Sequence, residues 1–143
     1  MRRTPIAALA MSAALATPAM AQGMDQRFLS SLAGKGDFFW AKGEQYSGDL
    51  APIRARVTSI EWEDGCNMVV RFGAATNGRA PYQSPVFIRW QSIKTVDIAG
   101  NFFILRHNYA GFMPGWRWGL WVPENEKARM RDVMGSMLNN CND

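Results

Sequence analysis

Residues 53–72, with the sequence IRARVTSIEWEDGCNMVVRF, decide the fold class of this chain. Two runs rich in β-branched and aromatic residues, Ile53–Glu63 and Cys66–Phe72, flank the dipeptide Asp64-Gly65. An Asp-Gly pair between two alternating apolar runs is typical of a β-hairpin, because both residues tolerate the backbone of a tight turn. The stretch therefore predicts two antiparallel strands.

The first of these runs changes phase part-way along. Its apolar residues alternate as far as Val57 and resume at Ile60, one position out of step. An extra residue in one strand, a β-bulge, produces such a shift and bends the strand. We therefore expect a bulge at Thr58 or Ser59, with the curvature that a small barrel requires.

The same texture, short apolar runs separated by Gly, Pro, Asn and Asp, continues in both directions, from residue 37 to residue 122. It predicts seven strands, at Phe38–Gln45, Ile53–Glu63, Cys66–Phe72, Val86–Trp90, Ile93–Ile98, Phe102–His107 and Arg117–Val122. The segment Gly73–Pro85 has no apolar period and is predicted to be a mobile loop.

Helical spacing is found at both ends of this β-rich part. Asp25–Leu32 predicts a short helix, with Asp25 as its N-cap and Gly34 after its end. Residues 124–141 predict a longer helix that opens with acidic residues and has one apolar face, formed by Met130, Val133, Met134, Met137, Leu138 and Cys141. The fold class expected is mainly β (α+β): a single small antiparallel β-barrel or β-roll of about seven strands, with a short N-terminal helix and a C-terminal amphipathic helix packed on it. Residues 22–143 are expected to form this one domain.

Seven short strands followed by one amphipathic helix give the chain a family resemblance. The local pattern is clearest in Ile88–Val96, Phe102–Leu105 and Leu120–Val122. Over Phe38–Leu138 the chain resembles a pleckstrin-homology-like barrel, and these segments are similar to its closing strands. The opening Phe28–Gly34 is similar to the start of small lipocalin-like periplasmic proteins, which is the second fold considered. Neither family has a shared active site, so the resemblance implies a fold and no functional residues.

The first 21 residues are predicted to be a cleavable signal peptide. Arg2 and Arg3 give a positive start, Ile6–Ala16 is mostly apolar, and Ala19-Met20-Ala21 presents small residues at the cleavage site, so the mature chain would begin at Gln22. The apolar stretch is shorter than the roughly 20 residues that span a bilayer. An alanine-rich signal of this kind is typical of bacteria, which predicts a periplasmic protein without a transmembrane segment after cleavage.

The composition excludes several classes of protein. The chain has 143 residues, of which 48% are hydrophobic and 20% charged, so a disordered tail protein is excluded. A mean hydropathy of -0.19 excludes a polytopic membrane protein. The net charge falls from +4 to +2 once Arg2 and Arg3 are removed, which is too small to indicate a nucleic-acid partner.

Export gives the two cysteines a meaning. In an oxidising compartment a pair of cysteines ordinarily forms a disulfide. Cys66 opens an alternating strand and Cys141 continues the apolar stripe of the last helix, so both sulfur atoms are predicted to face the core. We expect a structural Cys66–Cys141 disulfide, with two free buried thiols as the alternative.

An aromatic segment is the candidate partner or ligand surface. Residues 109–121 hold five aromatic side chains, and Arg117 and Trp121 share the strand face that is expected to point away from the core. The candidate contact residues are Tyr109, Phe112, Met113, Arg117 and Trp121, whose exposed apolar groups would meet a ligand, a partner or a membrane interface. The alternative is that two faces of a barrel bury them all.

Basic residues form a second candidate surface. Arg54 and Arg56 lie on one strand face, and four more cations fall on outward faces: Arg71, Arg89, Lys94 and Arg106. They would form either a belt for an acidic lipid, glycan or protein, or an outer surface of ion pairs, which is the more ordinary arrangement.

Catalytic residues are scarce in this sequence. His107 is the only histidine, so we expect no metal site, and no cofactor motif or nucleophile–base pair is found. Glu61 and Glu63 share a strand face and are the only candidate for an acid–base pair, which would act on a glycoside. The function expected is therefore an exported non-catalytic binding or interaction module of the periplasm, whose partner is a protein, glycan or amphipathic ligand of the cell envelope. The alternatives are an envelope-glycan hydrolase that uses Glu61 and Glu63, and a carrier of a small amphipathic ligand.

Overall fold

The computed structural model describes residues 18–43, 52–108 and 115–142. Its elements, in chain order, are α2 (Pro18–Ser30), β1 (Asp37–Lys42), β2 (Ile53–Trp62), β3 (Asn67–Phe72), β4 (Val86–Arg89), the 3-10 turn η1 (Trp90–Ser92), β5 (Ile93–Ala99), β6 (Phe102–His107), β7 (Trp116–Trp121), the 3-10 turn η2 (Glu124–Glu126) and α3 (Lys127–Cys141). Each predicted strand is present. β1 ends at Lys42, because Gly43 adopts a left-handed backbone that takes the chain out of the strand. The predicted end, Gln45, lies outside the described residues.

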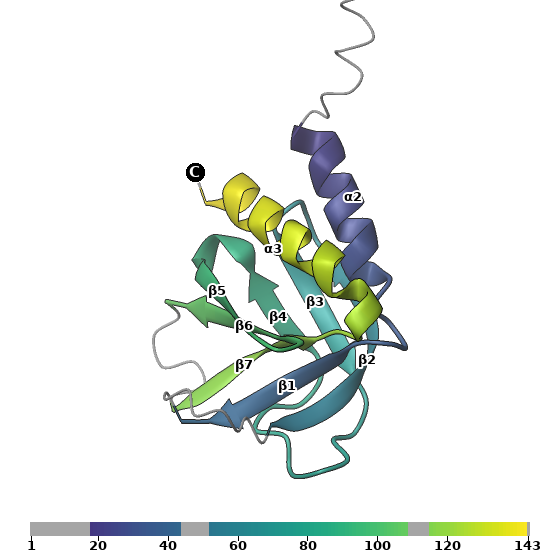
Figure 1. Cartoon of the computed structure of the whole chain (residues 1–143), viewed down its shortest axis with the longest axis vertical. Helices are drawn as coiled ribbons and strands as arrows, with labels where there is room; N and C mark the ends of the chain where they lie inside the picture. Colours follow the sequence, from purple (N-terminus) through teal and green to yellow (C-terminus); the bar gives the residue numbers. More distant parts are fainter. Residues whose placement is uncertain (1–17, 44–51, 109–114, 143) are drawn as a thin grey trace, which may run out of the picture.

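The strands form one antiparallel sheet with the order β4-β3-β2-β1-β7-β6-β5 (Figure 1). Its two edges among the described strands, β4 and β5, follow each other in the chain through η1. The sheet therefore curls into a roll whose two edge strands are joined by this short turn. Among the described strands β4 and β5 do not pair, so the roll is open and not a closed barrel. The predicted fold class is confirmed in its β-roll form.

The hairpin between β2 and β3 is confirmed, together with its bulge. The pairing of the two strands changes register between Val57 and Ser59. At the turn, Asp64 Oδ1 accepts hydrogen bonds from the backbone N–H groups of Cys66 and Asn67, at 2.8 and 2.9 Å. Hydrogen bonds to the ionised carboxylate favour its charged form, so they hold the pKa of Asp64 below its ordinary value.

The inner face of the roll is filled by large side chains. Phe38 of the central strand β1 lies 4.8 Å from Trp40, 5.4 Å from Phe72 and 5.8 Å from Trp118, measured between ring centroids. The helices α2 and α3 lie side by side against one end of the roll (Figure 1). The predicted apolar stripe of α3 is confirmed, with Leu138 partly buried against the core and the other five residues buried: Met130, Val133, Met134, Met137 and Cys141. No helix in residues 18–43, 52–108 or 115–142 has the length and apolar character needed to cross a membrane.

The start of the first helix was predicted wrongly. Asp25 is not an N-cap, because α2 is already helical at Pro18, the first described residue. Apart from Gly23, the intervening positions hold Ala, Met and Gln, which favour helix and extend it upstream. Asp25 is instead buried between the two helices, where its Oδ2 accepts a hydrogen bond from the hydroxyl of Ser136 on α3.

A disulfide ties the end of α3 to the hairpin. The Sγ atoms of Cys66 and Cys141 are 2.03 Å apart and the Cα atoms 5.9 Å, which confirms the predicted pair. The bridge closes a separation of 75 residues. In the chain-entropy model a loop of that size contributes roughly 4 kcal/mol to the free energy of unfolding.

Gly119 on β7 permits the close approach of β6 and β7. A Cβ atom at this position would lie 1.9 Å from the backbone oxygen of Phe103. We predict that Gly119→Ala lowers the free energy of unfolding by more than about 2 kcal/mol, because the two strands must separate. Gly135→Ala on α3 is the matched control, since its Cβ would meet nothing within 4 Å. That variant should gain up to about 1 kcal/mol in urea unfolding. Equal effects of the two substitutions would contradict this account.

Asp25 predicts a pH dependence of stability. Burial raises the pKa of its carboxyl above the ordinary 3.8, although the Ser136 hydroxyl and the charge of Arg129 partly oppose the shift. Because the folded pKa exceeds the unfolded one, the contribution of Asp25 to stability is largest below pH 3.8 and is lost as the pH rises through the folded pKa.

The neutral variant Asp25→Asn should therefore gain thermal stability, relative to the native chain, between acidic pH and pH 7. Asp132→Asn is the control, because it removes the same charge from an exposed position on α3. Melting temperatures recorded from about pH 3.5 to pH 7 measure the difference. A native-to-variant difference that is constant with pH would rule out the raised pKa.

Candidate functional site

A row of paired residues crosses the outer face of the sheet. Asp37 on β1 pairs with Arg56 on β2 and, on its other side, with Trp121 on β7. Trp121 in turn pairs with Phe102 on β6. Directly opposed residues of antiparallel strands lie on the same face, so these four side chains form one line across four strands. Arg54, two residues before Arg56, lies on the same face.

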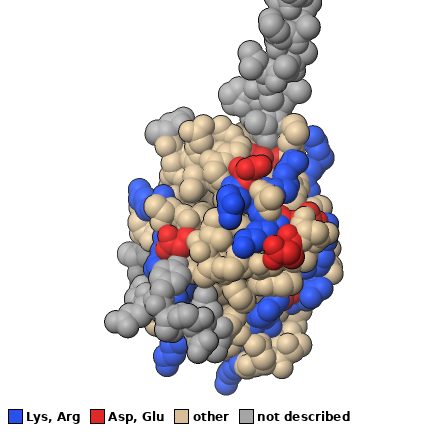
Figure 2. Space-filling model, viewed as in Figure 1, with Lys and Arg blue, Asp and Glu red and all other residues tan. Residues whose placement is uncertain are grey.

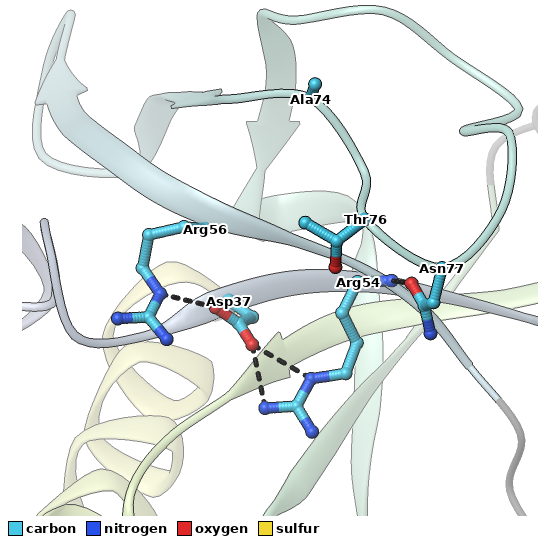
Figure 3. A pocket seen from close by; sticks show the side chains of 6 residues that line it. All are labelled: Asp37, Arg54, Arg56, Ala74, Thr76 and Asn77. Atoms are coloured by element: carbon cyan, nitrogen blue, oxygen red, sulfur yellow. Dashed lines mark hydrogen bonds and ion pairs between the residues drawn. The ribbon is translucent and has the colours of Figure 1, made fainter.

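The carboxylate of Asp37 is held by two arginines (Figure 3). Arg54 donates to Oδ2 from Nε at 2.8 Å and from Nη2 at 2.7 Å. Arg56 donates to Oδ1 from Nε at 2.7 Å, and its Nη1 donates to the Gly34 carbonyl at 2.9 Å. The Asp37 side chain is only 8% exposed, whereas those of Arg54 and Arg56 are 32% and 54% exposed. Each arginine side chain is thus anchored to Asp37 and remains partly exposed to solvent.

The chain that follows β3 supplies the wall of this site. Gly73 N–H donates to the Arg56 carbonyl at 3.0 Å, and Arg54 N–H donates to Asn77 Oδ1 at 2.9 Å. Asn77 Nδ2 donates to the Pro52 carbonyl at 2.7 Å. The predicted loop Gly73–Pro85 has no helix or strand, but its first residues are tied to β2 by these bonds.

Together these elements surround a hollow of about 390 Å³, which we call the arginine hollow. It is lined by Asp37, Arg54, Arg56, Ala74, Thr76 and Asn77 (Figure 3). Two guanidinium groups face one carboxylate, so the hollow carries an excess of one positive charge. Arginine stays protonated at any ordinary pH and offers N–H donors alone. The arrangement is suited to holding an anionic group. Neither guanidinium can serve as a general acid or a general base.

Aromatic rings lie beside the arginine hollow. The Cζ atom of Arg54 is 4.1 Å from the ring centroid of Trp121 and 5.4 Å from that of Phe102. Phe102 packs edge-on against the buried ring of Phe39, with the centroids 4.9 Å apart. A guanidinium at these distances is attracted by the aromatic faces. The rings therefore hold Arg54 in place and provide a half-buried apolar surface next to the charge.

The predicted contact residues are distributed as follows. Trp121 lies on the outer face, as expected, and is half-buried under Arg54. Arg117 is on the same face by its pairing with Ala41, but it is 5% exposed. Tyr109, Phe112 and Met113 lie outside the described residues.

The sequence analysis missed Asp37, Thr76 and Asn77. A lone aspartate at the head of an apolar strand, with Arg-x-Arg on another strand, was the available signal for the first of these.

Most of the predicted basic surface is ion-paired. Arg71 Nε is 3.3 Å from Glu61 Oε1, and Arg106 Nε is 2.7 Å from Asp97 Oδ2. Figure 2 shows Lys and Arg side chains interspersed with acidic ones on the visible face, without one continuous patch. This agrees with the more ordinary of the two predicted arrangements, and it sets apart the arginine hollow, where two cations share one acid.

The carboxylates Glu61 and Glu63 are both exposed at the hairpin between β2 and β3, and neither lines the arginine hollow. His107 ends β6 with its ring 5.2 Å from that of Trp118. Within the described ranges, no three His, Cys, Asp or Glu side chains come together as ligands for a metal ion.

A second hollow lies at the end of α3. It has a volume of about 540 Å³ and is lined by Gln91, Lys94, Cys141 and Asn142. The amide of Asn142 donates to the carbonyls of Trp90 and Ile93, both at 3.1 Å, so this side chain closes the corner between β4 and β5. The side-chain amide of Asn142 is thus engaged in joining α3 to the sheet.

No family model, curated protein or solved structure matches this chain. The similarity to the pleckstrin-homology-like and lipocalin-like barrels therefore stays a prediction from sequence pattern.

Proposed function

We propose that this protein is an exported, non-catalytic binding module whose arginine hollow receives an acidic group of its ligand. The observation that supports this is the sharing of one buried carboxylate, Asp37, by two guanidinium groups that are themselves partly open to solvent. Charge-assisted hydrogen bonds from arginine to a carboxylate or phosphate are among the stronger polar contacts in proteins. The partner is a protein, glycan or amphipathic ligand of the cell envelope, and nucleic acid is not proposed.

Export is part of the same proposal. Residues 1–21 would be removed as a signal peptide and the mature chain would act in the periplasm. The Cys66–Cys141 bridge supports this destination, because disulfides persist in oxidising compartments and are rare in reducing ones.

Neither alternative function gains support from the geometry. A glycan hydrolase would need Glu61 and Glu63 in a cleft, but Glu61 is exposed and paired with Arg71. A carrier would need an internal cavity, but the rings of Phe38, Trp40 and Trp118 pack together in the interior of the roll.

Export predicts a defined mass for the mature protein. When the full chain is expressed in bacteria and recovered from the periplasm, we expect its intact mass to be that of a chain beginning at Gln22. The mass should also be two hydrogen atoms lower than that of the reduced form. Ala21→Leu should retain the precursor, because signal peptidase requires a small residue there. A full-length protein with two free thiols would overturn the periplasmic assignment.

Anion binding predicts a local response in nuclear magnetic resonance spectra. Titration with acetate or inorganic phosphate should shift the side-chain Nε–H signals of Arg54 and Arg56 in a saturable way. The Nε–H signal of Arg71, whose exposed pair with Glu61 lies away from the hollow, should stay in place.

Arg56→Gln should weaken this binding about tenfold or more, because it removes charge-assisted hydrogen bonds. Arg71→Gln, which removes the same charge elsewhere, should leave binding unchanged. Absence of a saturable shift at Arg54 and Arg56 with either anion would contradict the proposed function.

A further inference from the structure

The charges of the arginine hollow distinguish between kinds of anion. Two arginines and Asp37 leave one positive charge, so a ligand group with a single negative charge makes the site neutral. A dianionic phosphate would leave a negative charge among partly buried groups, and burying an unpaired charge is costly. The balance therefore favours a carboxylate over a phosphate monoester or inorganic phosphate.

The donors that remain are arranged for a second carboxylate. Among the described residues, Asp37 and Gly34 accept from Nε and Nη2 of Arg54 and from Nε and Nη1 of Arg56. Within residues 18–43, 52–108 and 115–142, no acceptor takes the N–H groups of Nη1 on Arg54 and Nη2 on Arg56, so these are the donors that we assign to a ligand. Asp37 itself bridges the two arginines with one oxygen on each, so one carboxylate already engages both guanidinium groups.

The aromatic rings beside Arg54 indicate that the rest of the ligand is apolar. Trp121 and Phe102 are cross-strand neighbours, and the guanidinium of Arg54 lies over both rings. Both rings are half-buried, while Phe39 beneath them is fully buried. An acid bound to the outer edge of Arg54 would place the atoms attached to its carboxylate next to this aromatic pair, where apolar groups lose contact with water.

We propose that the ligand of the arginine hollow is a monoanionic carboxylate carried on an apolar body, with the carboxylate on Arg54 and Arg56 and the body against Trp121 and Phe102. This rests on the proposed function and deepens it by naming the class of ligand. A free organic acid and the carboxyl terminus of a peptide that ends in an apolar residue share this chemistry.

The test compares phenylacetate, acetate and inorganic phosphate by the Nε–H shifts of Arg54 and Arg56. Phenylacetate should bind about tenfold more tightly than acetate, since part of its ring leaves water against the aromatic pair. Acetate should bind more tightly than phosphate at a pH above the second pKa of phosphoric acid, where the phosphate dianion predominates.

Two apolar variants test where the ring lies. Trp121→Leu should remove most of the advantage of phenylacetate over acetate. Phe87→Ala is the control, because Phe87 is a 57% exposed ring on β4 that does not line the hollow. If Phe87→Ala removes the advantage and Trp121→Leu does not, the position proposed for the ligand body is wrong.

Asp37→Asn tests the charge argument while keeping the size of the side chain. It raises the excess charge by one, so phosphate should gain about tenfold relative to acetate. A Tm close to that of the native chain establishes that the variant is folded. If it does not fold, the native preference for acetate over phosphate decides the same point.

A third comparison identifies the source of the carboxylate. The peptide Ala-Ala-Phe is measured with a free and with an amidated carboxyl terminus. Binding of phenylacetate alone supports a small organic acid, and binding of the free-ended peptide as well supports a peptide terminus. Equal binding of the amidated and free peptides would overturn carboxylate recognition.

The proposal on ligand class and the proposed function fail in different ways. If acetate and phosphate both leave the Arg54 and Arg56 signals unchanged, the arginine hollow is not an anion site and both are wrong. If anions bind but phosphate binds as tightly as acetate, or phenylacetate no more tightly than acetate, the ligand class is wrong and the anion site remains.

Discussion

The arrangement of the outer face depends on a carboxylate buried at the head of the central strand. β1 is the fourth of the seven strands, and each of its residues except Lys42 is buried, Asp37 included. A carboxylate in that position needs positive partners, because an unpaired buried charge is strongly unfavourable. Arg54 and Arg56 are the residues that the β1–β2 register brings within reach. Asp37 therefore holds two arginines beside it, and because two cations pair with one acid, the hollow has one excess positive charge.

The bulge in β2 lets a single strand supply both this site and the core. Before the bulge, Arg54 and Arg56 point outward while Ala55 and Val57 are buried in the core. After it, Ile60 is in the core and Trp62 packs against it, on the side where α2 docks. The hydroxyl of Ser30 on α2 donates to the Ile60 carbonyl at 2.8 Å and accepts from Trp62 Nε1 at 3.2 Å. Without the change of register, Ile60 and Trp62 would lie on the arginine face, and α2 would lose its apolar contacts with β2 while keeping those with α3.

Local patterns were sufficient for most of the fold and for only part of the site. Alternation located the strands and the bulge, and helical spacing located the buried face of α3 and the direction of Cys141. The start of α2 was missed because Asp25 looks like a cap in local sequence, whereas its actual partner, Ser136, is on the other helix. Partners distant in sequence also explain why only part of the site was predicted. That Arg54 and Arg56 share a face follows from the period of a strand, but their meeting with Asp37 and Trp121 depends on the register of β1 with β2 and β7. Register between strands distant in sequence is set by the packed core, and local pattern does not contain it.

The way in which Asp37 pairs with both arginines affects how a ligand would bind. If a ligand had to displace Asp37 from the arginines, the competition would lower its affinity. Here Asp37 accepts from the inner edges of both guanidinium groups, and their outer Nη atoms are the ones a ligand would meet. Arg54 is further held over Trp121 at 4.1 Å, and Arg56 is held by the Gly34 carbonyl. These contacts restrict the rotamers of both side chains in the absence of a ligand. Binding to groups that are already ordered avoids the entropy cost of immobilising them, so an anion that bound here would lose little affinity to the ordering of these two side chains.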